Sequence, residues 1–505
     1  EMSASLVGSE MCIRDRDYPD PDVIRVEDTY YMVSTTMHFM PGCEILQSFD
    51  LVHWEHVTYV YETLDHTDAQ QLKSGQNIYG QGMWAASLRY HEGRFYICFV
   101  ANDTRKTYLY TSEKIDGPWK KQLIEGFYHD GSLLFDEDGR NYIVYGNDEI
   151  WITELNEDLT APKKDGLHRL LVSDHKNPEL GYEGSHIQKI NGYYYIFLVH
   201  SLRDRWMRTE ACFYSDSLEG EFTGGDVLCD DRGYCGQGVA QGGIVDTPDG
   251  KWYAMLFQDS GAVGRIPILL PVTWKDHFPV FGQNGHVPEE IEVHSTRPGY
   301  IYQPLVGSDD FCNGLLPRWQ FNHDPDPRYY HLDALQGTYT ITTREVCTEL
   351  TQAVNTLTQR MSYPSCAAEV TVDASALKEG DVAGLCALQG CYAAVGITKH
   401  HGKYEVLMLD KKEDGILDMT EGTVVESHQM DFRLEADFCN MKDEARCYYR
   451  VNKGDWLPIG TVHKLYFKLD HFTGCRFGLF CYAAEETGGS ACFRDFKYYD
   501  VDEIS

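Results

Sequence analysis

DPDVIRVEDTYY (residues 20–31) contains, in order, a distinctive first residue, a run of small and apolar positions, a turn and a strand rich in aromatic side chains. Four more stretches repeat this order: WAASLRYHEGRFY from Trp84, DGSLLFDEDGRNY from Asp130, EGSHIQKINGYYY from Glu183 and QGGIVDTPDGKWY from Gln241. The expected turn pairs stand at the same place in every copy: Asp28-Thr29, Glu92-Gly93, Asp138-Gly139, Asn191-Gly192 and Asp249-Gly250. Asn-Gly and Asp-Gly pairs between apolar strands are typical of tight β-hairpins. The sequence therefore predicts five hairpins in one shared register.

The spacing of these repeats predicts a β-propeller. Consecutive copies begin roughly 45 to 65 residues apart, which is enough for one four-stranded sheet per repeat. Five such sheets arranged radially form a five-bladed β-propeller, in which equivalent positions of all blades meet at a central channel. The residues at the shared first position are Asp20, Trp84, Asp130, Glu183 and Gln241. Three carboxylates, an indole and an amide around one channel indicate a functional site.

A second repeated signal and a change of pattern divide the chain into two domains. SFDLVHW (48–54), SEKIDGPW (112–119) and SDSLEGEF (215–222) share a Ser, a nearby acid and a final aromatic residue, and TELNEDL (153–159) is a degenerate copy. We expect these to be outer-strand turns of the blades. VPEEIEVHSTRPGYIYQP (287–304) has the charges and prolines of a linker. Short strands such as CAAEVTVDA and KLYFKLD follow it and predict an antiparallel β-sandwich. The expected fold is all-β, with a five-bladed propeller over residues 17–295 and a sandwich over 296–505.

The composition favours a globular protein that binds a neutral ligand. The formal net charge of −34 argues against nucleic acid, which needs a basic patch, and against an anionic polysaccharide. The same charge also serves solubility. No apolar run approaches the roughly 18–20 residues that a membrane-spanning helix requires. We therefore expect a neutral ligand, with no nucleic acid and no membrane, and we leave open a homo-oligomer.

Cysteine usage and the first residues bear on the cellular location. The sixteen cysteines are scattered without CxxC pairs, which favours reduced thiols in a cytoplasmic protein over a disulfide framework. The first sixteen residues, EMSASLVGSEMCIRDR, lack the apolar core of a signal peptide and do not continue the strand pattern. We expect residues 1–16 to be a non-native or truncated leader. An extracellular or periplasmic location stays open in case an export signal is missing.

Several carboxylates around one channel suit the cleavage of a glycosidic bond. This reaction needs one proton donor and one base or nucleophile on opposite sides of the sugar. The donor must hold its proton near neutral pH, which burial or a neighbouring carboxylate achieves. Asp20, Asp130 and Glu183 can divide this work, and Trp84 offers a flat face on which a sugar can stack. The alternatives are a turn cap for a lone Asp, core packing for Trp84 and a backbone hydrogen bond for Gln241.

At these residues the chain closely resembles glycoside hydrolase family 43, five-bladed propellers that attack sugars derived from xylan and arabinan with inversion of configuration. The resemblance covers essentially the whole chain after residue 16. YPDPDVIRVEDTYYMVST, HDGSLLFDEDG and YEGSHIQKINGYYY are similar to its first-, third- and fourth-blade motifs. The resemblance implies that Asp20 is the general base, that Asp130 tunes the pKa of the acid and that Glu183 is the general acid. GRIPILLPVTW resembles a segment whose Arg, here Arg265, reaches the bound sugar.

Two departures from the family pattern concern the channel. Many members have a His near a calcium ion or a water cluster at the fifth-blade position, where this chain has Gln241 in VAQGGIVD. An amide oxygen remains a weaker ligand for a hard cation, so Gln241 is a candidate both for substrate contact and for a channel metal. The second departure is MWAASLRY, in which relatives commonly have a Pro after the WA; we expect Trp84 to stay in place. We expect no cofactor in the chemistry and consider Ca²⁺ only as a structural ion.

The C-terminal region resembles the accessory sandwich of the β-xylosidase branch, on QFNHDPDPRYYHL and LTQAVNTLTQR. The resemblance implies that an aromatic side chain of the sandwich reaches the leaving-group side of the pocket, and Phe472 in HFTGCRFGLF is the candidate. TTMHFMPGCEILQ (35–47) resembles the exo-acting type and implies Phe39 as a pocket wall. Both aromatics could instead be core residues. Asp310 in SDDF and Asp495 in FRDF could hold a structural calcium or be solvated turn acids.

These observations predict an inverting, exo-acting glycoside hydrolase. It would release D-xylose, and L-arabinofuranose as a second product, from non-reducing ends of xylo-oligosaccharides or arabinoxylan fragments. An α-L-arabinofuranosidase or an arabinan-degrading hydrolase is the alternative, and a non-catalytic sugar-binding propeller is a remote one because all three acids are present. The first-blade PDPD does not match the Asn-Asp-Pro-Asn motif of a fructosidase.

Overall fold

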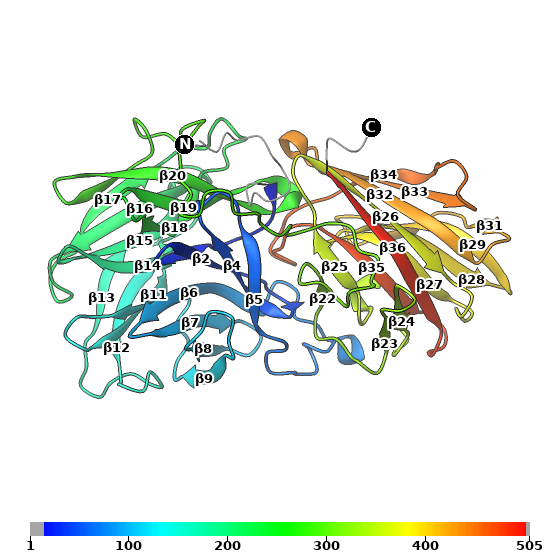
Figure 1. Cartoon of the computed structure of the whole chain (residues 1–505), viewed down its shortest axis with the longest axis horizontal. Helices are drawn as coiled ribbons and strands as arrows, with labels where there is room; N and C mark the ends of the chain where they lie inside the picture. The colour runs from blue at the N-terminus through cyan, green and yellow to red at the C-terminus, as the bar shows by residue number, and fades with distance from the viewer. Residues whose placement is uncertain (1–14, 501–505) are drawn as a thin grey trace.

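The computed structural model describes residues 15–500. Figure 1 shows two β domains side by side, the propeller in blue to green and the sandwich in yellow to red. Within residues 15–500 no α-helix forms, and η3 (Lys73–Gly75), η4 (Gly261–Val263), η5 (Leu350–Gln352) and η6 (Cys439–Met441) are single 3-10 turns. None of them has the length or the apolar character of a membrane-crossing helix. The chain is all-β, with a five-bladed propeller followed by a sandwich, as the repeats predict.

Each blade is a four-stranded antiparallel sheet built in sequence order. Blade 1 consists of β1 (Asp22–Val26), β2 (Thr29–Ser34), β4 (Gly42–Ser48) and β5 (Glu55–Tyr61). Blade 2 consists of β6 (Met83–His91), β7 (Arg94–Ala101), β8 (Lys106–Ser112) and β9 (Lys120–Ile124). Blade 3 consists of β10 (Ser132–Phe135), β11 (Asn141–Asn147), β12 (Glu149–Leu155) and β13 (His168–Ser173). Blade 4 consists of β14 (Glu183–Ile190), β15 (Tyr193–Ser201), β16 (Arg208–Ser215) and β17 (Thr223–Leu228). Blade 5 consists of β18 (Ala240–Asp246), β19 (Trp252–Asp259), β20 (Arg265–Lys275) and β21 (Phe278–Phe281). The first strands of neighbouring blades contact one another, so they surround the channel.

The hairpin turns follow the predicted register in part. Two-residue turns form at Glu92-Gly93 and Asn191-Gly192, as the pairing of the flanking strands requires. In blade 1 the turn lies one residue earlier than expected, because Val26 pairs with Thr29. Blades 3 and 5 have five-residue loops, 136–140 and 247–251, instead of tight turns. Each of these loops is closed by a backbone hydrogen bond between its first and last residues, which holds the longer connection in place.

The second repeated motif lies where it was expected. The segments 48–54, 112–119 and 215–222 connect the third to the fourth strand of blades 1, 2 and 4. The degenerate copy at 153–159 does the same in blade 3. The Ser of this motif makes local hydrogen bonds: in blade 1, Ser48 Oγ accepts from the backbone N–H of Leu51 at 2.8 Å. Such side-chain-to-backbone bonds favour turns over continued strands.

Apolar layers between the blades hold the ring together. Alternate side chains of each sheet pack against the next blade, as expected for sheets that are buried on both faces. The layer between blades 5 and 1 contains Tyr253 and Leu269 on one side and Tyr30, Met32 and Trp54 on the other. This layer closes the ring, and an ion pair between Arg25 of β1 and Asp246 of β18 joins the same two blades.

The sandwich consists of two antiparallel sheets around its own apolar core. One sheet contains β22 (Gln320–Asn322), β25 (Leu357–Arg360), β27 (Asp381–Leu388), β28 (Ala393–His400), β29 (Lys403–Lys411), β30 (Leu417–Met419), β31 (Thr423–Val425) and β35 (Arg476–Ala483). The other contains β23 (Tyr330–Asp333), β24 (Thr338–Thr342), β26 (Ser365–Asp373), β32 (Gln429–Asp437), β33 (Glu444–Val451), β34 (Leu457–Lys464) and β36 (Ser490–Asp500).

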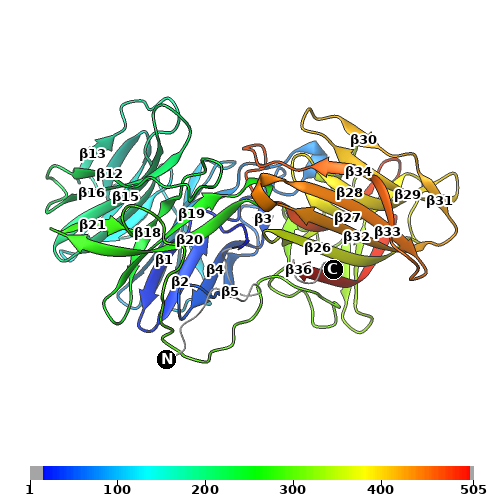
Figure 2. The same cartoon turned by 90° about the horizontal axis from the view of Figure 1, so that it is seen from above.

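The two domains are joined through a shared sheet. β3 (Phe39–Met40) lies within blade 1 of the sequence but pairs with β22 of the sandwich, and Figure 2 shows β3 at the junction. The linker also packs closely, because the Phe49 N–H donates to the Tyr302 hydroxyl at 2.9 Å. Residues 1–14 of the predicted leader lie outside the described residues. Its last residue, Arg16, is fully buried, and the carbonyl of Asp15 accepts from the Tyr363 N–H at 2.7 Å. The folded structure therefore includes the end of that segment.

Candidate active site

The shared first position of the repeats adopts an unusual backbone in three of the five blades. Asp20, Asp130 and Gln241 have φ values of 53°, 47° and 66°, in the left-handed region that residues other than glycine seldom enter. Asp20 and Asp130 each stand two residues before the first strand of their blade. Such backbone strain persists where the surrounding structure fixes it, and it is common at functional sites. Asp20 and Asp130 therefore lie outside the strand ladder, whereas Gln241 lies within β18 at a register shift.

Asp20 is held by one cation and one hydroxyl. Arg265 Nη1 donates to Asp20 Oδ1 at 3.1 Å and lies 3.3 Å from Oδ2. The Thr35 hydroxyl donates to Oδ2 at 2.6 Å. Both Asp20 and Arg265 are buried, so the ion pair is screened little by solvent. These contacts fix the orientation of the Asp20 carboxylate.

Asp130 is a buried acid that faces the other two carboxylates. Burial raises its pKa to about 6, and the charges of Glu183 and Asp20 add to this effect while His129 opposes it. Asp130 Oδ2 accepts from the backbone N–H of Gly184 at 3.0 Å. Gly184 has a φ of 65°, and a Cβ at this position would stand 2.8 Å from the Gln241 side chain, so glycine is required here. The Gly after Glu183 in the EGS motif therefore connects Asp130 to the fourth blade.

Glu183 begins β14, where a register shift bends the strand before His186. Its Oε2 atom accepts from Asn147 Nδ2 at 2.7 Å and lies 3.3 Å from His129 Nε2. Both nitrogen donors bind the same carboxyl oxygen, so the other oxygen, Oε1, is not engaged by either of them. Glu183 is therefore oriented by its neighbours in the third blade.

His129 bridges two of the three acids and was missed by the sequence reasoning. Its Nε2 atom lies 3.5 Å from Asp130 Oδ2 and 3.3 Å from Glu183 Oε2. Burial disfavours the charged imidazole, but Asp130 and Glu183 outweigh this effect and raise the pKa of His129 to about 9. The only sequence signal was its position directly before Asp130 in HDGS. The site therefore holds an imidazolium between its carboxylates near neutral pH.

Aromatic side chains from both domains enclose the site. The Trp84 ring lies 5.9 Å from the His129 ring and 5.5 Å from the Phe472 ring, measured between ring centroids. Phe472 comes from the sandwich loop before β35 and has the Arg265 guanidinium 4.2 Å from its ring centroid. Trp84, His129, Glu183 and Phe472 line one cavity of about 840 Å³ between the domains. The structure thus brings Trp84 and Phe472 together with the acids.

Arg208 is a second functional residue that sequence reasoning missed. It begins β16, lines the cavity and is held by Asp259, whose Oδ2 accepts from Arg208 Nε at 2.9 Å. Burial disfavours the charged guanidinium, but Asp259, Glu183 and Asp20 raise the pKa of Arg208 above its usual value. The motif MRTEACFYS around it carried no distinguishing spacing. Arg208 and Arg265 together balance part of the negative charge of the site.

The structure places Phe39 and Gln241, like the buried Asp20, Asp130 and Arg265, outside the cavity lining. Phe39 is 1% exposed, and the Arg476 guanidinium carbon lies 3.5 Å from its ring centroid. The pocket-wall role stays a prediction that gains no support here, because β3 leaves the blade and pairs with the sandwich sheet, where the Phe39 ring joins an apolar cluster. Gln241 is buried beside Gly184, and its backbone N–H donates to Glu210 Oε2 at 2.7 Å. It supports the site from behind rather than lining the cavity.

The proposed channel metal is not supported by the residues around Gln241. The nearest acid there is Glu210, and burial raises the pKa of this carboxyl well above its usual range, which favours the neutral acid. Between residues 15 and 500, a single group of three potential ligands forms, His129, Asp130 and Glu183, with ligand atoms within 4.8 Å of one another. Because the raised pKa of His129 keeps its imidazole protonated near neutral pH, this group is a poor cation site.

The structural calcium predicted for the sandwich stays a prediction. Asp310 Oδ1 accepts from the Cys312 N–H at 2.9 Å, which is a local turn contact. Asp309 accepts from the Phe311 N–H and from Trp319 Nε1, both at 2.8 Å. No third carboxylate, imidazole or thiol joins Asp310 and Asp495 among residues 15–500. Asp310 makes a local turn contact, whereas Asp495 lies within β36, where its φ is 52° and the pairing with β26 shifts register.

The arrangement can perform acid–base chemistry on a glycosidic bond. One carboxyl group, Glu183, is oriented by two donors at the cavity surface, while another, Asp20, is fixed by Arg265 behind it. A third, Asp130, lies close to both and disfavours further negative charge. Cleavage with inversion requires one such acid and one base, with space for a water molecule between the base and the sugar. The site offers both.

Comparisons with known proteins identify the family. The family "Glycosyl hydrolases family 43" matches residues 11–279, and the β-xylosidase C-terminal concanavalin A-like domain matches residues 308–499. A β-xylosidase of Formosa agariphila is 26% identical over 97% of this chain and 88% of its own length. A xylosidase/arabinosidase of Humicola insolens is 25% identical over 95% of both chains. A solved structure described as a bifunctional GH43-CE protein of Bacteroides eggerthii is 42% identical over 98% of this chain, with a TM-score of 0.91, and this chain spans 64% of its length. The chain belongs to glycosyl hydrolases family 43 and is a glycoside hydrolase with the concanavalin A-like C-terminal domain of its β-xylosidases.

Proposed function

We propose that this hydrolase releases D-xylose from the non-reducing ends of xylo-oligosaccharides, with inversion at the anomeric carbon. Glu183 protonates the leaving oxygen, Asp20 activates the attacking water, and Asp130 keeps the proton on the acid. The observation that carries this proposal is the double hydrogen bond to Glu183 Oε2, from Asn147 and His129, because neither donor engages Oε1, which we assign as the proton-donating oxygen. The names of the relatives from Formosa agariphila and Humicola insolens support xylose as the released sugar.

The hydrogen bonds and positions of the two acids support the division of roles between them. Asp20 accepts three hydrogen-bond contacts from Arg265 and Thr35, so it is oriented as a carboxylate that can accept a proton from water. Glu183 faces the cavity, where the leaving oxygen would lie. Each role contributes on the order of 10² to 10⁴-fold in rate when the group is well placed. The reaction breaks the glycosidic C–O bond, places the water oxygen on the sugar and moves one proton from Glu183 to the leaving chain.

The shape of the site supports exo-action. Phe472 of the sandwich and Trp84 of blade 2 pack against each other in the cavity wall, with their ring centroids 5.5 Å apart. Asp20, Asp130 and Arg265 are buried and do not line the cavity, but Asp130 contacts the lining residue His129 and Arg265 contacts Phe472. We propose that the cavity ends at these residues, so that a chain does not continue beyond them. A terminal sugar therefore enters at the base, while the rest of the oligosaccharide extends towards the opening. L-arabinofuranose is the second sugar that we propose, because the Humicola insolens relative is named for both activities.

The experiment that tests this function compares sugars and follows the anomer. Nitrophenyl β-D-xylopyranoside and α-L-arabinofuranoside, xylo-oligosaccharides and arabinan would be assayed side by side. Proton NMR of the first product should show α-xylose from a β-xyloside. Cleavage of arabinan alone, internal cleavage products or retention of the anomer would overturn the proposal.

A further inference from the structure

The cavity extends well beyond the catalytic residues. Its volume of about 840 Å³ lies near the upper part of the range of about 300–1,000 Å³ that is common for ligand sites. Its lining includes residues from blades 2, 3 and 4 and from the sandwich that lie away from the catalytic acids. Four of them are Arg105, Phe127, Trp206 and Lys468. Arg105 is exposed and Trp206 is 42% exposed. An exo-acting enzyme holds its leaving chain in this outer part.

Arg105 and Phe127 form a preorganised pair at the opening. Arg105 lies in the turn between β7 and β8, and its guanidinium carbon stands 3.6 Å from the centroid of the Phe127 ring. At this distance the flat guanidinium covers the ring face, which is a favourable cation–π arrangement. Stacking occupies the face of the guanidinium and leaves the N–H groups at its edge available. Those donors form the fork that matches a carboxylate with two parallel hydrogen bonds.

Arg105 differs from the other cations that line the cavity. Arg208 is paired with Asp259, and Lys468 is paired with Glu413. Lys464 donates to the backbone carbonyls of Met441 and Lys442. Among the lysines and arginines that line the cavity within residues 15–500, Arg105 alone has neither a carboxylate nor a carbonyl partner for its side chain. An unpaired guanidinium is unexpected beside an opening in a chain with a net charge of −34, where acidic partners are abundant.

We propose that Arg105, stacked on Phe127, binds a carboxylate on the leaving chain, so that uronic acid-substituted xylo-oligosaccharides are preferred substrates. The inference rests on the proposed function, because it assumes that the terminal xylose occupies the base of the cavity. The leaving chain then runs past Arg105 towards solvent. It adds a substrate class to the neutral oligosaccharides expected from the sequence.

The net charge of the protein does not oppose this local contact strongly. At physiological ionic strength, charges separated by more than about 8 Å in solvent are largely screened. The overall charge therefore disfavours a long polyanion that covers the surface, but it weakly affects one carboxylate in direct contact with Arg105. A hydrogen-bonded ion pair between Arg105 and a substrate carboxylate can then favour the acidic substrate over a neutral one that is otherwise equal.

The test compares two substrates that share one backbone. Xylotetraose and the same tetraose bearing a single glucuronic acid substituent on its reducing-end half would be assayed with the wild type, Arg105→Gln and Arg105→Lys. For the wild type we expect kcat/KM for the acidic substrate to exceed that for the neutral one by about 10- to 100-fold. Arg105→Gln should remove this ratio, and Arg105→Lys should retain only part of it because a lysine lacks the planar fork. Raising the salt concentration should lower the ratio in the wild type.

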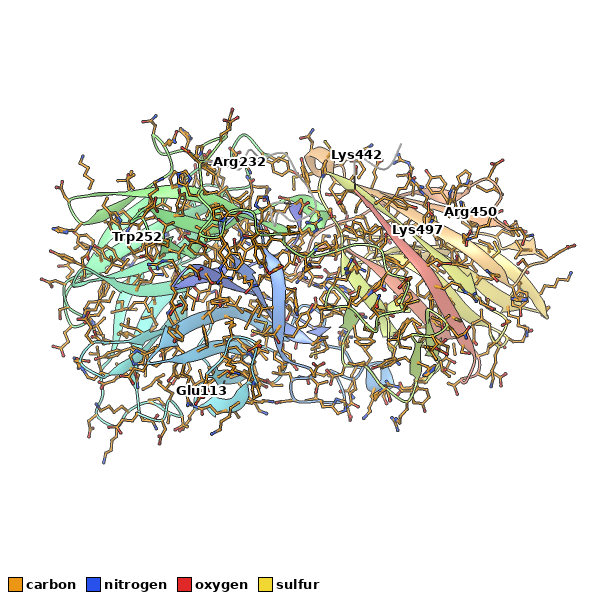
Figure 3. The ribbon with its side chains drawn as sticks, in the orientation of Figure 1. Glu113, Arg232, Trp252, Lys442, Arg450 and Lys497 are labelled. Atoms are coloured by element: carbon orange, nitrogen blue, oxygen red, sulfur yellow. The ribbon has the colours of Figure 1, made fainter. Side chains whose placement is uncertain are left out.

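The matched control is Arg94→Gln. Arg94 begins β7 of the same blade, is exposed and pairs with Glu113 at 3.4 Å, and it does not line the cavity. Figure 3 labels Glu113 at the outer edge of the propeller. This variant should keep the wild-type ratio. Equal kcat/KM for both substrates in the wild type, or a ratio that survives Arg105→Gln, would overturn the inference.

A binding measurement separates this inference from the proposed reaction. Calorimetric titration of Glu183→Gln with the acidic and neutral tetraoses reports affinity without turnover. Tighter binding of the acidic tetraose that disappears in Glu183→Gln/Arg105→Gln supports the carboxylate site even if the protein cleaves no xyloside. Cleavage of both tetraoses with equal binding would leave the hydrolase function intact and reject the role of Arg105.

Discussion

Arg265 Nη2 donates a hydrogen bond to the backbone carbonyl of Phe472 at 3.2 Å, which links the propeller to the sandwich inside the active site. The same guanidinium holds Asp20 through Nη1. A second link lies next to it, because Asp17 accepts from the Arg265 N–H at 2.8 Å and from the Gly474 N–H at 2.7 Å. The position of the sandwich loop and the orientation of Asp20 are therefore coupled through one arginine. The sandwich completes the site rather than merely adjoining it.

Arg265→Lys should reduce activity although it keeps the charge. The donors of a lysine all lie on one nitrogen. They cannot reach Asp20 and the Phe472 carbonyl from two separate atoms, as the planar guanidinium does. Loss of a hydrogen bond to a charged group costs about 1.5–3 kcal/mol, which predicts a fall in kcat/KM of about 10- to 100-fold. Steady-state kinetics on nitrophenyl xyloside would measure it. A value within twofold of the wild type would show that Asp20 does not depend on this contact.

Glu183→Ala should separate substrates by their leaving groups. A natural xylo-oligosaccharide needs a proton on its leaving oxygen, so its turnover should fall by about 10² to 10⁴-fold. Nitrophenyl xyloside has a good leaving group and should lose much less. Asp20→Ala removes the activation of water and should reduce both substrates by similar factors. If Glu183→Ala and Asp20→Ala affect both substrates equally, the assigned roles of the two acids are wrong.

Asp130→Asn should change the pH dependence of the reaction. Burial and the neighbouring carboxylates raise the pKa of Asp130 to about 6, so it is mostly charged at neutral pH. Removal of that charge makes loss of the proton from the general acid easier. The alkaline limb of the kcat profile on xylobiose should therefore move to lower pH by about one unit. An unchanged alkaline limb would show that Asp130 does not act through the acid.

The register of the repeats was sufficient to predict the three acids. Equivalent positions of a propeller meet at its channel whatever the loop lengths, so Asp20, Asp130 and Glu183 converge even though two blades have longer loops than predicted. The acids converge because the blades close into a ring around one channel, and the spacing of the strands in the sequence indicates that ring. Phe472 reaches the same site from the other domain, where only the family resemblance had indicated it.

Residues placed by contacts between distant segments could not be predicted in this way. His129 has no counterpart at the shared first position, and its function depends on lying 3.3 Å from Glu183 of the next blade. Phe39 occurs in a segment that resembles a pocket wall, yet β3 pairs with a strand nearly three hundred residues later. A pattern of alternation specifies which residues are buried, but not which of two domains buries them.

Phe39→Ala should destabilise the junction between the domains. The ring is packed under the Arg476 guanidinium within an apolar cluster of the sandwich. Removal of a buried Phe side chain typically costs about 3–5 kcal/mol through lost burial and the cavity left behind. Thermal unfolding should therefore begin at a lower temperature, while KM at a temperature where the protein is folded should change little. A large change in KM without a loss of stability would support Phe39 as a pocket residue.

The wild type should lose stability as the pH rises through the pKa of His129, and His129→Asn should not show this loss. Burial disfavours the charged ring, but Asp130 and Glu183 raise the pKa of His129 from 6.5 to about 9. A group whose pKa is higher in the folded state stabilises the protein fully below its unfolded pKa, and this contribution is lost as the pH rises through the folded pKa. The window is therefore from about pH 6.5 to just above 9, and the contribution is on the order of 3 kcal/mol.

Urea unfolding at pH 6.5, 8 and 9.5 would measure this contribution as a difference between proteins. The free energy of unfolding of the wild type should fall across the window by about 3 kcal/mol more than that of His129→Asn. His331→Asn, which changes an exposed histidine on β23, is the control and should follow the wild type. The interval from pH 8 to 9.5 decides the comparison, because Asp130, whose pKa of about 6 is held down by His129, still titrates near the lower end of the window and does so at higher pH in His129→Asn. Parallel curves for the wild type and His129→Asn would mean that the imidazole is not held as a cation between the two carboxylates.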